Sequence, residues 1–194
     1  MARILIVGGG CRGRLLAGEL VSAGHAARVT TRSEVRRERI ESVGAECWVG
    51  TPDRLATLRG VLDGVAIACW MLARARGPAE QVAALHASRL EFFLHQVIDT
   101  TVRGFLYDAS PGLVPPEALA KGARIARSLT ELNAIPARVV ECARGDGGDR
   151  ERAEWIAAAR GAIESLLGGR RERERRAPPG ASGRPGDSSG GLCA

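Results

Sequence analysis

Lysine, tyrosine and aromatic residues in general are scarce in this chain of 194 residues. Lys121 is the one lysine and Tyr107 the one tyrosine, and aromatic residues make up 4% of the sequence. The core must therefore be built from alanine, valine, leucine and isoleucine. The net charge is +6, but almost all of the basic residues are arginine, with no basic stripe and no interleaved aromatics. We therefore do not expect binding to nucleic acid.

The sequence also lacks the patterns of membrane, secreted and metal-binding proteins. No apolar run approaches the roughly 20 residues that span a bilayer, and Met1-Ala2-Arg3 leads into a strand-like segment without a signal-peptide pattern. The five cysteines are Cys11, Cys47, Cys69, Cys142 and Cys193. None form a C-x-x-C pair, and no histidine lies at metal-ligand spacing from them. We therefore expect a cytoplasmic protein with reduced thiols, no metal site and no membrane partner.

Apolar, strand-like segments alternate with helical patterns along the chain. The expected strands are Arg3–Val7, Ala27–Thr31, Glu46–Val49, Val65–Leu72, Gly104–Tyr107 and Arg138–Cys142. The expected helices are Gly13–Ala23, Ser33–Val43, Arg54–Leu62, Pro78–Ile98, Glu117–Asn133 and Arg150–Leu167. This alternation predicts an α/β fold in which a doubly wound parallel sheet of about six strands has helices on both faces.

The composition predicts one domain followed by a tail. Residues 1–168 carry the alternating pattern, whereas residues 169–194 are rich in Arg, Gly, Pro and Ser and are expected to be disordered. One face of the long helix 78–98 is expected to pack on the sheet and gathers Val82, Leu85, Leu90, Phe93 and Val97. Phe92 and Leu94 widen this apolar surface, so both a monomer and a homodimer stay open.

A glycine-rich turn follows the first strand, in the segment Ile-Leu-Ile-Val-Gly-Gly-Gly-Cys-Arg-Gly of residues 4 to 13. Gly8, Gly10 and Gly13 have the G-x-G-x-x-G spacing. In this motif the first glycine allows a tight turn, the second lets a pyrophosphate approach the backbone, and the third lets the helix pack close to the strand. The turn therefore predicts a dinucleotide site at a helix N-terminus. The alternative is a structural turn that binds nothing.

The end of the second strand discriminates between NAD(H) and NADP(H). A carboxylate there would bind the ribose hydroxyls of NAD and repel a 2′-phosphate. The strand ends instead in Thr31-Arg32, and the Arg32 guanidinium can hold a phosphate in a bidentate pair, with Arg12 able to reach the same group. We therefore predict NADP(H), although Glu34 is a nearby carboxylate and Arg32 could be a solvated residue at a helix start. Asp53 either caps a helix or borders the adenine.

Five segments of the chain together resemble a known family. They are Ile4–Val7 with the glycine loop, Gly24-His25, Thr30-Thr31-Arg32, Gly44-Ala45-Glu46 and Gly104-Phe105-Leu106-Tyr107-Asp108-Ala109-Ser110. Over about residues 3 to 142 the chain resembles the short-chain dehydrogenase/reductase superfamily. The most similar branches are the extended and atypical ones, which include nucleotide-sugar epimerases, NADP-binding reductases and NmrA-like regulators.

The resemblance implies a Rossmann sheet of order 3-2-1-4-5-6 with the cofactor across its carboxyl edge. It implies that Ser110 stands at the catalytic-serine position. It also implies that residues 69 to 72, among them Cys69 and Trp70, lie near the nicotinamide ribose. The superfamily's Tyr-x-x-x-Lys pair is missing, because Tyr107 lies inside a strand and position 111 is proline.

Other candidates for chemistry are few. Glu117 and Lys121 form either an acid/base pair or, more in keeping with their spacing, an exposed salt bridge. Cys11 is a cofactor-binding candidate in the glycine loop, either as a thiol that the cofactor shields or as a small residue packed beneath the loop. His86 and His95 are expected at the surface. No histidine is near Ser110 in sequence, so a hydrolytic triad is not supported.

Two functions stay open at this point. The first is an atypical NADP(H)-dependent reductase of a small carbonyl-type substrate, in which water, Ser110 or the ribose hydroxyl supplies the proton. The second is a non-catalytic, NADP(H)-binding redox-sensing module that contacts a protein partner. The sequence stops one helix after the sixth strand, where extended members of the superfamily place a substrate-binding segment. The missing segment and the missing Tyr-x-x-x-Lys pair favour the second.

Overall fold

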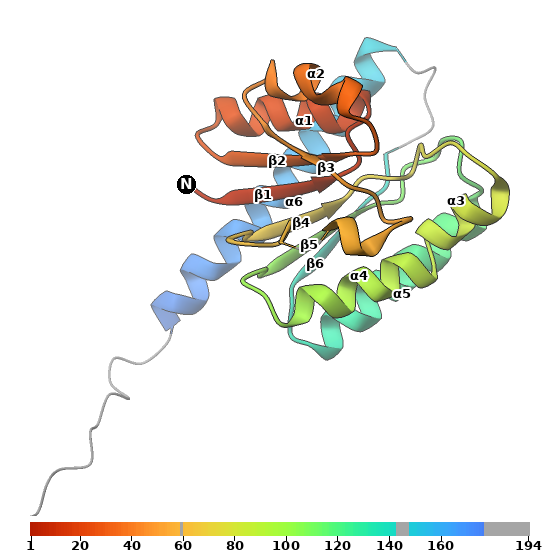
Figure 1. Ribbon diagram of the computed structural model, residues 1–194. Coiled ribbons are helices and arrows are strands. Elements are labelled where there is room, and N and C mark those ends of the chain that lie inside the picture. The colour runs from red at the N-terminus through yellow and green to blue at the C-terminus, as the bar shows by residue number, and fades with distance from the viewer. Residues whose placement is uncertain (59, 143–147, 177–194) are drawn as a thin grey trace, which may run out of the picture.

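The six strands form one parallel sheet. The computed structural model describes residues 1–58, 60–142 and 148–176. The strands are β1 (Arg3–Val7), β2 (Ala26–Thr31), β3 (Glu46–Val49), β4 (Ile67–Trp70), β5 (Gly104–Asp108) and β6 (Ala137–Val140). They pair in the order β3-β2-β1-β4-β5-β6 (Figure 1). The predicted α/β Rossmann architecture and its strand order are confirmed.

Helices cover both faces of the sheet (Figure 1). One face carries α1 (Cys11–Ser22), α2 (Arg37–Glu41) and α6 (Asp149–Arg176), and the other carries α3 (Ala79–Leu85), α4 (Ser88–Ile98) and α5 (Pro116–Leu132). The strand β1 separates two cores because successive side chains of a strand point to opposite faces. Ile4 and Ile6 pack in the core beneath α1 and α6, whereas Leu5 and Val7 pack in the core beneath α4 and α5.

The helix expected over residues 78–98 is broken into α3 and α4. All five residues of its predicted apolar face are buried, and packing on the sheet is confirmed for Leu90, Phe93 and Val97, whereas Val82 packs in a separate cluster with Val114 and Leu119. The break falls at His86 and Ala87, where Ala87 has φ −134° and ψ −110°. It turns His86 into the core, although the sequence there holds neither glycine nor proline. Of the two residues that were expected to widen the apolar surface of this segment, Leu94 is buried and Phe92 is exposed. The exposed apolar surface is therefore narrower than expected.

Two other expected helices are mostly replaced by shorter turns. Over residues 33–43 a 3₁₀ turn, Glu34–Arg36, precedes the short helix α2. Over residues 54–62 the described structure is a 3₁₀ turn, Leu55–Leu58, and Gly60 has φ +77°. A left-handed residue cannot continue a right-handed helix, so the helical pattern ends there. The expected strand 65–72 is also shorter, as β4.

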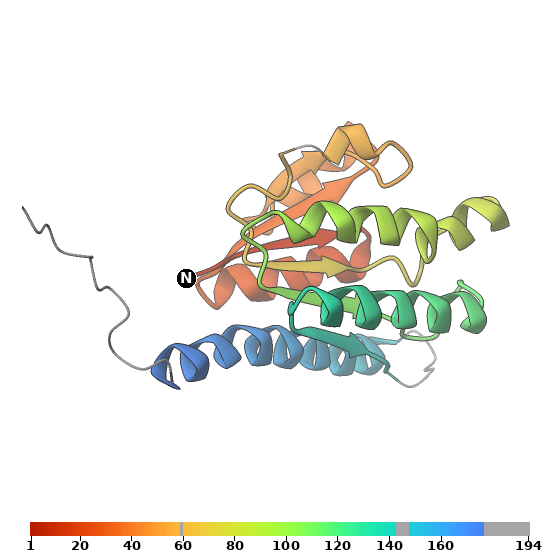
Figure 2. The same cartoon turned by 90° about the horizontal axis from the view of Figure 1, so that it is seen from below.

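The last helix is longer than expected. It continues beyond residue 167 to Arg176, so residues 169–176 are helical and do not belong to a disordered tail; arginine and glutamate, which alternate there, are good helix formers. Residues 177–194 of the predicted tail lie outside the described residues. Figure 2 shows α6 running along the strands, with its C-terminal turns beyond the end of the sheet where the N-terminus lies. In the described part of the chain, no helix is long and apolar enough to cross a membrane.

Candidate functional site

A cleft of about 540 Å³ lies at the carboxyl edge of the sheet. Ligands of open parallel α/β sheets bind at this edge. The cleft is lined by the ends of five strands and the segments that follow them. These are Gly8–Gly13 after β1, Thr31, Arg32 and Arg36 at and after β2, residues 50–53 after β3, Met71, Leu72 and residues 74–76 after β4, and Asp108 and Leu113 at and after β5. Arg152 of α6 also lines it.

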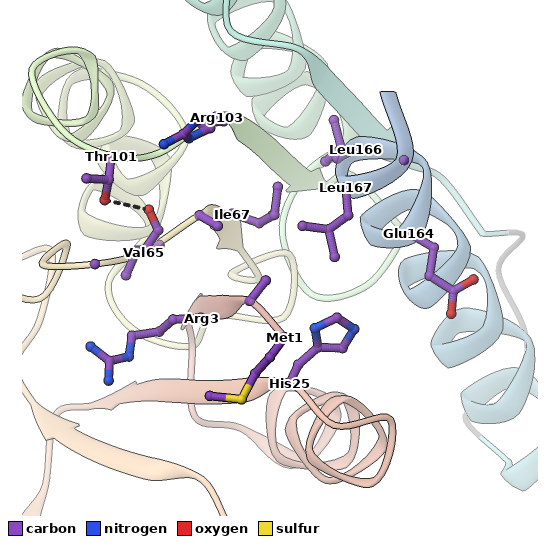
Figure 3. Close-up of a pocket in the computed structure, with 14 residues that line it drawn as sticks. Met1, Arg3, His25, Val65, Ile67, Thr101, Arg103, Glu164, Leu166 and Leu167 are labelled. Carbon is purple, nitrogen blue, oxygen red and sulfur yellow. Dashed lines mark hydrogen bonds between the residues drawn. The ribbon is translucent and has the colours of Figure 1, made fainter. Parts of the chain in front are cut away.

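A larger cavity, of about 740 Å³, lies at the opposite, amino edge of the sheet. Figure 3 shows Arg3 of β1 around it, together with His25 and Arg103 from the segments that precede β2 and β5. The hydrogen bond drawn there joins the Thr101 hydroxyl to the Val65 carbonyl, at 2.9 Å. Size alone does not make this cavity the functional site, because the glycine loop and the N-terminus of α1 both lie at the other edge.

The glycine loop is held tightly against β2 and α1. Gly8 has φ +127°, a conformation that side chains rarely adopt, and its N–H donates to the Thr30 hydroxyl at 3.2 Å. Gly9 donates its N–H to the Thr30 carbonyl at 2.8 Å. A Cβ on Gly13 would lie 2.1 Å from the Gly8 carbonyl oxygen. The roles that the motif assigns to Gly8 and Gly13 are therefore visible in the packing, and Gly9 has a packing role that the sequence analysis missed.

Gly10 differs from its neighbours because it borders open space. A Cβ built on Gly10 meets no atom within 4 Å, and this residue is the N-cap of α1. The first turn of α1 carries no acidic residue. Cys11 follows as the first residue of α1 and is exposed, so it is not packed beneath the loop. The backbone at Gly10 can thus be approached closely by a phosphate group, as the motif predicts.

Two arginines lie at the carboxyl end of β2. Arg32 and Arg36 are exposed, line the cleft, and form no ion pair with any residue that the structure describes. Glu34 pairs with Arg37, whose hydrogen bond lowers the pKa of the Glu34 carboxyl group. The nearby carboxylate is therefore already neutralised. Arg36 was not predicted; it ends the 3₁₀ turn Glu34–Arg36, which follows Arg32 closely after β2 and brings both arginines to the cleft.

Arg12 is directed toward α6. Its guanidinium pairs with the buried carboxylate of Glu151 and stacks over Trp155, 5.1 Å from the ring centroid. Arg74, in the loop after β4, donates to the same Glu151 oxygen at 2.6 Å. Glu151 therefore joins the glycine loop, the loop after β4 and the first turn of α6. The predicted contact of Arg12 with a ribose phosphate would have to compete with this ion pair.

Asp53 lines the cleft but caps no helix. Its carboxylate pairs with Arg89 of α4, and the Thr51 hydroxyl lies 3.1 Å from Asp53 Oδ2. Of the two predicted roles, capping is therefore wrong, and a place at the border of the adenine region stays a prediction.

Three other predicted site residues do not line the cleft. Cys69 and Trp70 are fully buried in the cores on opposite faces of the sheet, and burial raises the pKa of the Cys69 thiol. Met71 and Leu72, from the same predicted range, line the cleft instead. Ser110 is buried, and its hydroxyl accepts the Cys142 N–H at 3.3 Å. The hydroxyl therefore connects the ends of β5 and β6 and is not brought to the cleft.

Asp108 lines the cleft, although it was not among the site residues predicted from the sequence. It is 2% exposed at the end of β5, and its Oδ1 accepts the Ser110 N–H at 3.0 Å and the Trp155 Nε1–H at 3.2 Å. Burial raises the pKa of its carboxyl group, an effect that the hydrogen bonds and the Arg12 charge oppose. The sequence signal that could have identified Asp108 was a carboxylate at the end of a buried strand.

The expectations for His86, Glu117 and Lys121 were wrong. His86 is fully buried, and its Nδ1 lies 2.6 Å from the Tyr107 hydroxyl. Glu117 and Lys121, both within the described residues, form no ion pair with each other. Among the described residues no group of three or more His, Cys, Asp and Glu side chains gathers where it could hold a metal ion.

Comparison with known proteins finds similarity only in structure. No family model and no curated protein matches the chain. A short-chain dehydrogenase/reductase superfamily protein from Agrobacterium tumefaciens with bound NAD matches with TM-score 0.61 and 16% identity, over 72% of this chain and 48% of that one. The UDP-Glc/GlcNAc 4-epimerase from Campylobacter jejuni matches with TM-score 0.61 and 11% identity, over 75% and 56%.

Vestitone reductase from alfalfa gives a similar result, with TM-score 0.57 and 14% identity, over 72% of this chain and 56% of the reductase. The chain spans about half the length of these proteins. At such low identity the likeness establishes the fold. The chain therefore has a Rossmann fold like that of these proteins, which is the fold that the resemblance in sequence implied.

Proposed function

We propose that this chain binds NADP(H) at the carboxyl edge of its sheet. The observation that carries the proposal is the open space beside Gly10 in the same cleft as two exposed arginines, Arg32 and Arg36. A pair of guanidinium groups suits a 2′-phosphate. One of the matched structures holds NAD, which supports a nicotinamide dinucleotide, and the arginines favour its phosphorylated form.

Different residues of the cleft bind different parts of the dinucleotide. The first N–H groups of α1 face the pyrophosphate, and Arg32 and Arg36 hold the 2′-phosphate. Met71 and Leu72 keep water from the nicotinamide end. When bound, the reduced dinucleotide supplies a hydride.

The proposed reaction is the reduction of a small carbonyl-type substrate. Apolar side chains that suit such a substrate, Leu85 and Leu113, line the cleft together with Met71 and Leu72. A non-catalytic, redox-sensing module is the second candidate. The observation that favours it is the burial of Tyr107 and Ser110, since neither hydroxyl is among the groups that line the cleft.

Titration calorimetry with NADPH and NADH tests the binding proposal. We expect NADPH to bind at least about tenfold more tightly than NADH, a difference of about 1.4 kcal/mol. Arg32→Ala and Arg36→Ala should each reduce this difference. Arg39→Ala is the matched control, because Arg39 is exposed on α2 but does not line the cleft. If neither dinucleotide binds, or both bind equally well to the wild type, the proposal is overturned.

A separate measurement discriminates between the two candidate functions. NADPH oxidation is followed with a panel of small aldehydes and ketones at protein concentrations that allow a single turnover to be seen. Reduction of any member supports the reductase. NADPH binding without turnover over the whole panel supports the redox-sensing module.

A further inference from the structure

A buried carboxyl group lines the floor of the cleft without an ion-pair partner among the described residues. Asp108 ends β5, next to β4, whose following residues Met71 and Leu72 line the same cleft. Its carboxyl group is removed from water, which is unfavourable for a negative charge unless other groups stabilise it. A structural role alone would be met by a neutral amide. The acid at this position therefore needs an explanation.

Both N–H groups that bind the carboxyl group donate to the same oxygen. Ser110 and Trp155 each donate to Oδ1, at 3.0 and 3.2 Å. They orient the group through Oδ1, the Ser110 hydroxyl adds a further hydrogen bond to the carboxyl group, and Oδ2 is the oxygen to which we assign the proton. Burial favours the protonated form and raises the pKa.

We infer that Asp108 is the proton donor of the reductase, holding a proton at Oδ2 and delivering it to the carbonyl oxygen of a substrate in the cleft. This inference rests on the proposed NADP(H)-dependent function. It replaces Ser110 as the candidate for this role, because Ser110 does not line the cleft.

The step balances with the reduced dinucleotide as the named reductant. A hydride bonds to the carbonyl carbon, and the electron pair of the C=O π bond moves to oxygen. That oxygen takes the proton as the Oδ2–H bond breaks. The products are an alcohol, the oxidised dinucleotide and the Asp108 carboxylate, which regains a proton from solvent.

Several charged or titratable groups lie near this carboxyl group. Arg12 of α1 favours the carboxylate form, whereas the Tyr107 and Cys142 groups are affected by the Asp108 charge in turn. Trp155 of α6 and Ser110 contribute hydrogen bonds but no charge. Arg12 also pairs with Glu151, a carboxylate that it shares with Arg74.

Asp108→Asn is the variant that isolates the proton. The amide oxygen can still accept from Ser110 and Trp155, so the local fold is expected to survive, but the side chain cannot transfer a proton. Carbonyl reduction should fall by at least about 100-fold, the lower end of the effect of a general acid. NADPH affinity, measured by calorimetry, should change less than twofold. Glu117→Gln is the control, because Glu117 is an exposed carboxylate on α5 that does not line the cleft, and this variant should reduce carbonyls at close to the wild-type rate.

A spectroscopic readout on the protein without cofactor gives an independent test. Infrared difference spectra against Asp108→Asn, recorded over a pH series, should show the C=O band of a protonated carboxylic acid in the wild type persisting to higher pH than for an ordinary aspartate. If the variant fails to fold, the same C=O band is followed in the wild type during a pH titration.

The outcomes separate this inference from the proposed function. A failure of NADPH to bind would remove the proposed function. If NADPH binds and the Asp108 carboxyl group titrates like an ordinary aspartate, near 3.9, or if Asp108→Asn reduces carbonyls at the wild-type rate, Asp108 is not the donor.

Discussion

Arg74 Nη2 lies 2.6 Å from Glu151 Oε1, and Arg12 pairs with the same carboxylate. These two ion pairs join the glycine loop and the loop after β4, both at the rim of the cleft, to the first turn of α6. Glu151 is almost fully buried, whereas Arg74 is partly exposed. The arrangement therefore fixes α6 over the glycine loop through a charge that is costly to leave unpaired.

Glu151→Gln should destabilise the protein by about 3 kcal/mol, because it leaves the Arg12 guanidinium largely buried without a countercharge. Urea unfolding at neutral pH measures the change. Glu154→Gln is the matched control on the same helix, since Glu154 pairs with Arg150 at the exposed surface and should change stability by less than about 0.5 kcal/mol. Equal effects of the two variants would contradict a structural role for the buried pair.

Replacement of glycine by alanine should have opposite effects on stability at Gly122 and at Gly161. A Cβ on Gly122, in α5, would lie 2.0 Å from the Tyr107 hydroxyl oxygen, which is held by His86 and the Leu119 carbonyl. Gly122→Ala should therefore destabilise by about 2 kcal/mol. Gly161, in α6, has open space, so Gly161→Ala should stabilise by roughly 0.5–1 kcal/mol. Thermal unfolding of both variants checks the pair, and a stable Gly122→Ala protein would show that the helix can shift.

The elements that the sequence predicted correctly are those with local signals. The strand over residues 3–7 and the glycine loop are adjacent in sequence, so hydrophobic pattern and glycine spacing were sufficient. The missed residues depend on distant partners. His86 meets Tyr107 from 21 positions away, Asp108 meets Trp155 from 47, and Arg12 meets Glu151 from 139. Such pairings require the packing of separate helices on the sheet, which no local pattern specifies.

His86 should make the stability of the protein depend on pH. Burial lowers the pKa of its ring from 6.5 to about 4, so the unfolded chain binds a proton more readily than the folded one between these values. Stability is therefore complete above pH 6.5 and falls as the pH is lowered toward 4, by about 3 kcal/mol from this group.

Urea unfolding of wild type and His86→Gln from pH 7 to 4 measures this contribution. The glutamine side chain can still hydrogen-bond to the Tyr107 hydroxyl but does not titrate, so the stability of this variant should fall less with acid. His95→Gln is the control, because His95 is exposed on α4, and its pH dependence should match the wild type. If the stability of His86→Gln falls with decreasing pH as steeply as that of the wild type, the acid sensitivity arises from other groups.

Substitutions at two glycines of the glycine loop should affect stability and NADPH binding differently. A side chain on Gly13 would overlap the Gly8 carbonyl, so Gly13→Ala should destabilise the protein by about 2 kcal/mol or more. Gly10 has an extended backbone and open space, so Gly10→Val should cost only about 1 kcal/mol, for the poorer N-cap of α1. Its side chain would fill the room beside the backbone and should weaken NADPH binding at least about tenfold, a loss of about 1.4 kcal/mol. Calorimetry and thermal unfolding of both variants give the comparison. Undiminished NADPH binding by Gly10→Val would place the pyrophosphate elsewhere, because no closely approaching phosphate could share that space with a branched side chain.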